Sequence, residues 1–214
     1  MFSEHRFTTC FPTGVWSMMV NGAAALNQSL IPVINDLRSA QPWLANETVD
    51  DPGYGQQAQS VANLHNLDQF RDFTRIALGA ADQVLAFLKY EYVSSYITDC
   101  WANVCRRGEN HRAHVHPNNV LSGVYYACAP QGCGHIVFDD PRPQAKVLLP
   151  NVTELNPLNS HEFRIEPATG MLIMFPSWLT HRVTVSKSAE ERVSISFNVM
   201  LRGEIGYEKA SARL

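Results

Sequence analysis

The sequence contains little cysteine and no surplus of positive charge, and each shortage excludes a class of protein. Five cysteines are scattered over 214 residues, too irregularly for a disulfide framework, which indicates a reducing compartment. Cys128 and Cys133 are near enough in sequence to face each other across a hairpin, but free buried thiols are favoured. The net charge of −3 gives no basic surplus for binding nucleic acid or an anionic membrane surface.

Long apolar runs are also missing. No stretch approaches the roughly 18 apolar residues of a membrane span, and the first residues lack the apolar core, about 7–15 residues long, of a secretory leader. We therefore expect a cytoplasmic protein without a membrane partner. The hydrophobic content of 45% is nevertheless enough for a substantial core in a chain of this length.

Helical periodicity dominates the first part of the chain. Apolar residues recur at helical spacing over residues 20–40 and again over 67–92. Pro32 predicts a break or a helix start within the first of these segments. We predict that residues 1–95 form a helical layer packed on the rest of the protein.

Short β-prone runs replace the helical pattern from about residue 96. They are separated by turn sequences and cover residues 96–107, 120–129, 135–140, 162–167, 171–176, 181–186 and 192–201. Short strands without helices between them predict a sandwich or jelly roll rather than a parallel α/β sheet. We expect residues 96–214 to form this β core, and the two parts to make one compact domain.

Three histidines occur within six residues, in the segment HRAHVHP. If this segment is extended, successive side chains alternate, so that His114 and His116 share one face and His111 lies on the other. His181 begins a later strand and is the best candidate for a third partner. The pattern predicts a metal site of His114, His116 and His181 at strand ends. The remaining histidines are interpreted as ordinary core or surface residues, namely His5, His65, His111, His135 and His161.

The segment RVSISFN carries a pattern for anion binding. Its alternation places Arg192, Ser194 and Ser196 on one face of a strand. A guanidinium beside a hydroxyl group binds a carboxylate through paired, charge-assisted hydrogen bonds. Alone, Arg192 would be interpreted as a solvent-facing residue; eleven residues beyond His181, it indicates a ligand site.

These residues, taken in order, resemble the iron(II)- and 2-oxoglutarate-dependent oxygenases, particularly the prolyl 4-hydroxylase-like branch and a related group of uncharacterised oxygenases. The resemblance covers about residues 96–202 and rests on the segments WANV, HVHPNNVLSGVYYACAP, GHIVFDDPR, PATGMLIMFPSWLTHRV and RVSISFN. It implies a cupin-like double-stranded β-helix with N-terminal helices, Fe(II) as cofactor and 2-oxoglutarate as cosubstrate. The implied reaction decarboxylates 2-oxoglutarate to succinate and hydroxylates a C–H bond of a substrate.

Carried over by position, the resemblance assigns roles to individual residues. His114, His116 and His181 would ligate the iron. Arg192 would bind the distal carboxylate of 2-oxoglutarate, with Ser194 as a second contact.

Further residues are weaker candidates. Asn103 and Tyr125 fall on strands that the resemblance predicts to line the cosubstrate cavity, although core polar roles explain them equally well. Trp178 would either form a wall of the pocket or pack as an ordinary aromatic residue.

The ligand set departs from the family's pattern. Two histidines and one carboxylate are usual, but His116 stands where the carboxylate belongs. A cupin-type dioxygenase or zinc enzyme with three histidines and no 2-oxoglutarate therefore remains an alternative, as does a non-catalytic metal-binding module. Asp139 or Asp140 is the alternative source of a carboxylate. The sequence does not distinguish a small-molecule substrate from a peptidyl one, and it leaves a homodimer open.

Overall fold

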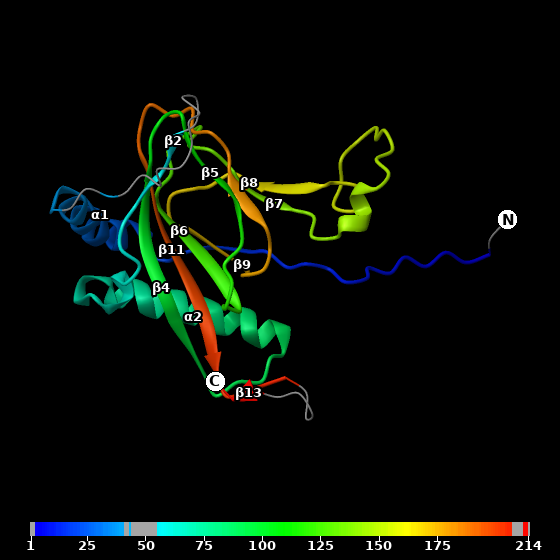
Figure 1. The fold of residues 1–214 in the computed structure, drawn as a ribbon, viewed down its shortest axis with the longest axis horizontal. Coiled ribbons are helices and arrows are strands. Elements are labelled where there is room, and N and C mark those ends of the chain that lie inside the picture. The colour runs from blue at the N-terminus through cyan, green and yellow to red at the C-terminus, as the bar shows by residue number, and fades with distance from the viewer. Residues whose placement is uncertain (1–2, 41–42, 44–54, 207–211, 214) are drawn as a thin grey trace.

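A computed structural model describes residues 3–40, 43, 55–206 and 212–213 of the chain (Figure 1). Two mostly antiparallel β-sheets form the body of the molecule, and two helices pack against the larger sheet (Figure 1). The mainly β fold with N-terminal helices is confirmed.

The helices are α1 (Ala23–Ala40) and α2 (Arg71–Leu88). Short 3₁₀ turns cover Leu64–Asn66, Asp68–Phe70 and Pro143–Lys146. Helix α1 begins at Ala23 and continues through Pro32, so the expected break or helix start at this proline is wrong. Pro32 is exposed, while Leu30 and Ile34 on either side of it are fully buried, and this packing offsets the lost backbone hydrogen bond.

The strands fall into two main sheets and one small hairpin. The six-stranded sheet has the order β1-β9-β6-β11-β4-β3, the five-stranded sheet has the order β2-β5-β10-β7-β8, and β12 pairs with β13. The bounds are β1 (Trp16–Met19), β2 (Gly55–Gln56), β3 (Ala58–Gln59), β4 (Ser94–Cys105), β5 (Glu109–His114), β6 (Leu121–Cys128), β7 (Ile136–Asp139), β8 (Glu162–Ile165), β9 (Met171–Pro176), β10 (His181–Val183), β11 (Arg192–Arg202), β12 (Glu204–Ile205) and β13 (Ala212–Arg213).

The chain passes between the two main sheets as it proceeds from β4 to β11. Strands β4, β6, β9 and β11 belong to the large sheet, and β5, β7, β8 and β10 belong to the small one. This is the expected double-stranded β-helix. Between β7 and β8, residues 140–161 project from the body (Figure 1).

The N-terminal part also contributes strands. β1 pairs with β9 and β3 with β4 in the large sheet, while β2 pairs with β5 in the small sheet. These short strands had no clear signal in the sequence. The division of the chain at residue 95 stays a prediction.

Two apolar clusters hold the layers together. The larger one lies between the helices and the large sheet and includes Phe73, Ala77 and Phe197, which are fully buried. The smaller one lies between the sheets and includes Val124 and Phe175. Because alternate residues of a strand face opposite ways, β6 and β11 contribute to the helix-packed core with one face and to the space between the sheets with the other.

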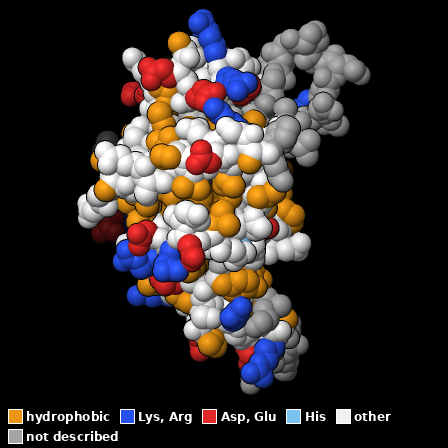
Figure 2. Space-filling view, turned by 90° about the vertical axis from the view of Figure 1, so that its left-hand side faces the viewer, with side chains coloured by type: hydrophobic (Ala, Val, Ile, Leu, Met, Phe, Trp, Pro, Cys, Tyr) orange, Lys and Arg blue, Asp and Glu red, His pale blue; other side chains and the backbone are white. Residues whose placement is uncertain are grey.

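The surface agrees with the charge balance. Figure 2 shows acidic and basic side chains next to one another on one face of the molecule, without a basic patch there. Within the described ranges, no helix has both the length and the hydropathy that crossing a membrane requires. Cys128 and Cys133 are free thiols.

Candidate metal and cosubstrate site

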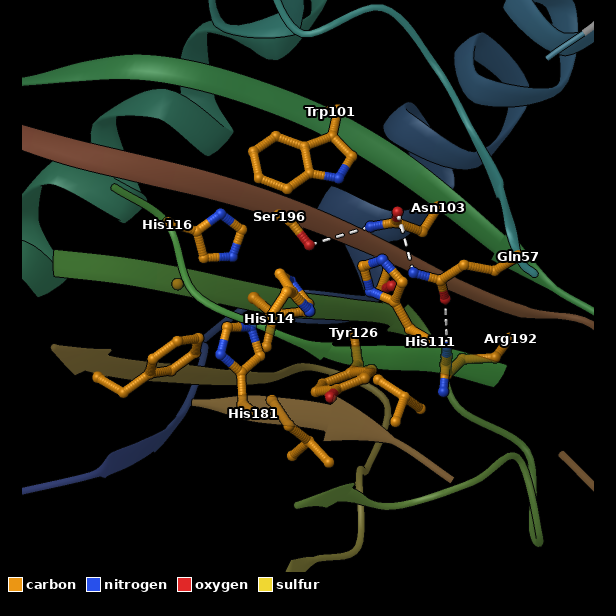
Figure 3. A pocket seen from close by; sticks show the side chains of 16 residues that line it. Gln57, Trp101, Asn103, His111, His114, His116, Tyr126, His181, Arg192 and Ser196 are labelled. Carbon is orange, nitrogen blue, oxygen red and sulfur yellow. Dashed lines mark hydrogen bonds between the residues drawn. The ribbon is translucent and has the colours of Figure 1, made fainter. Parts of the chain in front are cut away.

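A pocket opens between the two sheets, and its wall is polar at both ends (Figure 3). His114, His116 and His181 gather at one end, and Arg192 lies with Gln57 at the other (Figure 3). The pocket therefore combines a cluster of nitrogen donors with a cationic group.

The three predicted histidines come together. One candidate ligand atom from each of His114, His116 and His181 lies within 4.8 Å of the others. The ring centroids of His114 and His181 are 4.2 Å apart, and those of His114 and His116 are 4.9 Å apart. In the described residues, this is the one group of three or more His, Cys, Asp or Glu side chains close enough to share an ion.

Strand pairing brings these residues together from distant parts of the sequence. His114 ends β5, His181 begins β10, and the two are direct partners in the antiparallel pair. His116 lies in the loop after β5, where its N–H donates to the Ser177 carbonyl oxygen at 2.9 Å. The His116 loop is thereby tied to the segment that leads into His181.

In His114 and His181, a hydrogen bond determines which ring nitrogen is free to bind a metal. His114 Nδ1 lies 2.8 Å from the Arg112 carbonyl oxygen, and His181 Nδ1 lies 2.9 Å from the Leu179 carbonyl oxygen. A carbonyl oxygen can only accept, so each Nδ1 carries the proton and each Nε2 keeps its lone pair. This is the usual way in which a protein orients a histidine toward a metal.

Burial keeps the cluster uncharged. Desolvation lowers the pKa of His181 to about 3 and that of His116 to about 4, and His114 adds to both shifts. Burial likewise lowers the pKa of His114. Three neutral imidazoles suit a divalent first-row metal such as iron or zinc, so the donor set fits the expected iron.

His111 also lines the pocket, which corrects its interpretation as an ordinary residue on the other face. Its ring centroid lies 4.3 Å from that of His114. In the pair of β10 and β5, His181 lies opposite His114, and Val183 lies opposite His111. The two positions are two residues apart on β10 but three residues apart on β5, so β5 contains one extra residue. This β-bulge breaks the alternation on which the sequence argument relied. His116 lies beyond the end of β5, so strand alternation did not govern its direction either.

Arg192 lies at the far end of the pocket and is only 1% exposed. Its Nη1 donates to the Cys133 carbonyl oxygen at 3.0 Å, and its Nη2 donates to Gln57 Oε1 at 2.6 Å. Its Nε has no partner among the described residues, and none of their ion pairs includes Arg192. A buried guanidinium with only neutral partners is available for an anionic ligand.

The other predicted cosubstrate residues divide into two groups. Ser194 and Asn103 line the pocket, as does Ser196, whose Oγ accepts from Asn103 Nδ2 at 3.0 Å. Tyr125 does not: its hydroxyl donates to Asn27 Oδ1 at 2.6 Å, and its ring packs against Phe73 on the helical side.

Placing Tyr125 in the cavity was therefore wrong. The residue that faces the pocket is its neighbour, Tyr126. Tyr126 is nearly fully buried, and desolvation raises its pKa to about 12. The apolar run around these tyrosines gave no alternation from which to choose between them.

The alternative carboxylates have other partners. Asp139 pairs with Arg182, and Asp140 pairs with Arg142 at 2.8 Å. Neither carboxylate lines the pocket. Trp178 is 57% exposed and also lies outside the lining, whereas Trp101 belongs to it.

One pocket of this double-stranded β-helix contains three neutral imidazoles and a buried arginine that has only neutral partners. This combination is typical of metal-dependent enzymes that bind an anionic small molecule beside the metal. The comparisons with known proteins match part of this chain to a family. Residues 99–198, a little under half of the chain, match the family described as "Putative 2OG-Fe(II) oxygenase". The matched segment includes His114, His116, His181 and Arg192.

Solved structures share the fold at low sequence identity. A Pseudomonas putida prolyl-4-hydroxylase is 14% identical with a TM-score of 0.61, covering 89% of this chain and 94% of its own. The epimerase SnoN, in complex with Fe3+, alpha ketoglutarate and nogalamycin RO, is 14% identical with a TM-score of 0.62, over 88% and 79%. A Trichoplax adhaerens prolyl hydroxylase, in complex with a hypoxia inducible factor peptide fragment, is 12% identical with a TM-score of 0.57, over 88% and 84%. No curated protein sequence matches the chain.

Over residues 99–198 the chain is similar to the iron(II)- and 2-oxoglutarate-dependent oxygenases. It is a non-haem iron oxidoreductase, with Fe(II) as cofactor and 2-oxoglutarate as cosubstrate. The resemblance seen in the sequence is confirmed at this level.

Proposed function

We propose that His114, His116 and His181 hold one Fe(II), and that Arg192 with Ser194 binds the distal carboxylate of 2-oxoglutarate for the hydroxylation of a substrate. The observation that carries this proposal is the pairing of two features in one pocket: three neutral imidazoles at one end and a buried guanidinium without a counter-ion at the other (Figure 3).

The arrangement suits a ligand with two different ends. 2-Oxoglutarate carries a 2-oxo acid group, which chelates a metal, and a second carboxylate, which requires a cation. Arg192 supplies a planar fork of N–H donors from β11, and Ser194, two residues further on, lines the same pocket. His111 and Tyr126 lie between the two ends and form the wall along which the cosubstrate would lie (Figure 3).

The bound Fe(II) would supply the oxidation chemistry, in which oxygen and 2-oxoglutarate are consumed and a C–H bond is hydroxylated. The chain's own residues orient the reactants and exclude water. The carbonyl oxygens of Arg112 and Leu179 hold two of the imidazoles with Nε2 deprotonated. His116 replaces the usual carboxylate, which leaves the site one charge more positive and favours a dianionic cosubstrate.

The substrate belongs to one of two chemical classes. The related structures include an epimerase in complex with a small molecule and a prolyl hydroxylase in complex with a peptide fragment. We accordingly propose a small-molecule or peptidyl substrate. The net charge of −3 and the sparse cysteines support a cytoplasmic protein that acts without nucleic acid.

A substrate screen tests the proposal. The Fe(II)-loaded protein is incubated with 2-oxoglutarate, oxygen and pools of amino acids, peptides or metabolites, and succinate is measured. We expect succinate formation that a pool stimulates and that Arg192→Ala abolishes. Metal binding with no consumption of 2-oxoglutarate in any pool would favour a three-histidine enzyme of another kind or a metal-binding module.

A further inference from the structure

Gln57, which belongs to no recognisable sequence motif, contacts the proposed cosubstrate arginine directly. It is only 5% exposed and lines the pocket. Its Oε1 accepts from Arg192 Nη2 at 2.6 Å, and its Nε2 donates to Asn103 Oδ1 at 3.2 Å. Asn103 in turn donates to Ser196, so a chain of hydrogen bonds crosses the end of the pocket (Figure 3).

The direction of this chain is fixed by its members. A guanidinium can only donate, so the amide of Gln57 must turn its oxygen toward Arg192. Its nitrogen then faces the carbonyl oxygen of Asn103, which accepts. Gln57 thus satisfies one N–H of Arg192 and is itself held from the other side.

The backbone places Gln57 where the two sheets meet. It lies between β2, which pairs with β5 of the small sheet, and β3, which pairs with β4 of the large sheet. The Gln57 N–H donates to the Asn110 carbonyl oxygen at 3.2 Å. In the β3–β4 pair Ala58 lies opposite Val104, so continuing the register by one residue places Gln57 opposite Cys105. On the other side of β4, Cys105 is paired with Arg192 of β11. The pairing of both sheets therefore fixes the position of this amide next to the guanidinium.

The charge of Gln57 matters as much as its position. An acidic residue here would form a buried ion pair with Arg192, and the guanidinium would no longer be available to a ligand. A neutral acceptor orients the fork and leaves its charge uncompensated.

We propose that Gln57 is a positioning residue that aims Arg192 at the distal carboxylate and thereby sets the preference for a 2-oxo diacid over a 2-oxo monoacid. This inference rests on the proposed function. It assigns to the N-terminal part of the chain a role in selecting the cosubstrate of the β core.

The test compares two 2-oxo acids of equal chain length on the metal-loaded, oxygen-free protein. 2-Oxoglutarate has the distal carboxylate, and 2-oxopentanoate lacks it. Calorimetry gives the ratio of their dissociation constants for the unmodified protein, Gln57→Glu and Gln57→Leu. Gln59→Glu in β3, outside the pocket lining, is the matched control for added charge.

We expect Gln57→Glu to weaken 2-oxoglutarate binding at least about tenfold while the affinity for 2-oxopentanoate stays within about twofold. Gln57→Leu should reduce the same preference, because Arg192 loses its acceptor. Gln59→Glu should keep it. Circular dichroism and metal analysis verify that each variant is folded and loaded.

The outcomes separate this inference from the proposed function. If the unmodified protein binds neither acid, the proposed function fails. If it prefers 2-oxoglutarate and Gln57→Glu keeps that preference, the inference about Gln57 is wrong and the proposed function stands. An equal loss for both acids in the Gln57 variants would mean a merely structural residue and would also overturn the inference.

Discussion

Replacing Arg192 with methionine should weaken binding of 2-oxoglutarate while changing the stability of the fold very little. Methionine fills much of the volume of the arginine side chain and carries no charge. In the metal-loaded protein we expect Arg192→Met to weaken 2-oxoglutarate binding strongly and to leave metal affinity unchanged, because a guanidinium does not ligate iron.

The magnitude follows from the contacts that the fork offers. Two charge-assisted hydrogen bonds to a carboxylate are worth about 1.5–3 kcal/mol each, so their loss corresponds to about 3–6 kcal/mol. At 1.4 kcal/mol for each factor of ten, the dissociation constant should rise by roughly 10²- to 10⁴-fold.

Stability should respond much less than binding. Arg192 is 1% exposed and has no carboxylate partner among the described residues, so its removal leaves no unpaired acid in the core. The variant gives up hydrogen bonds to Cys133 and Gln57 but avoids the desolvation of a buried charge, which costs several kcal/mol. We expect the Tm of the metal-free protein to change by no more than about 4 °C, the equivalent of roughly 1 kcal/mol in a chain of this size.

Calorimetry and thermal unfolding, each with and without metal, provide the assay. Unchanged affinity for 2-oxoglutarate in a folded, metal-loaded Arg192→Met variant would refute the assignment of Arg192 and favour an enzyme that does not use the cosubstrate.

Three further predictions concern the histidines and the corrected tyrosine. His116→Asp should retain one metal per chain and shift the absorption band of bound 2-oxoglutarate; an unchanged spectrum would mean that His116 is not a ligand. Folding lowers the pKa of His181 to about 3 and that of His116 to about 4, whereas both are about 6.5 in the unfolded chain. At a pH between the folded and unfolded pKa values, the unfolded state therefore binds more protons than the folded state. Urea titrations of the metal-free protein should therefore show stability falling as the pH drops from about 6.5 toward 4, and a flat profile would contradict these pKa directions. Tyr125→Phe should lower the free energy of unfolding by about 1 kcal/mol, because the hydrogen bond to Asn27 is lost, and should leave 2-oxoglutarate affinity unchanged. A tenfold loss of that affinity would mean that Tyr125 contacts the cosubstrate.

Most strands of the core were predictable because they depend on local pattern, and the sequence positions of His114, His116 and His181 marked the three residues that meet in the cluster. Short β-prone runs separated by turns predicted seven of the eight strands from β4 to β11, all except β5. The alternation of RVSISFN placed Arg192, Ser194 and Ser196 on the pocket wall together. His181 was found through its position at the start of a strand, which is where the structure has it.

The parts that were missed depend on pairing between distant segments. A β-bulge brings His111 into the pocket, and nothing in HRAHVHP marks the extra residue. Tyr125 and Tyr126 are chemically alike within an apolar run, so the face toward the helices is defined only by the packing of α1 and α2. Gln57 reaches Arg192 because two very short strands pair with different sheets, and strands of two residues leave no periodicity to detect.

The most direct test of the central claim is an anaerobic titration of the metal-free protein with Fe(II) in the presence of 2-oxoglutarate, followed by the charge-transfer absorption of the bound cosubstrate. We expect a band that saturates at one Fe(II) per chain and that is absent from the His114→Ala/His181→Ala double variant, which should remain folded. A band of equal strength and stoichiometry in that double variant would show that the metal and its cosubstrate bind elsewhere.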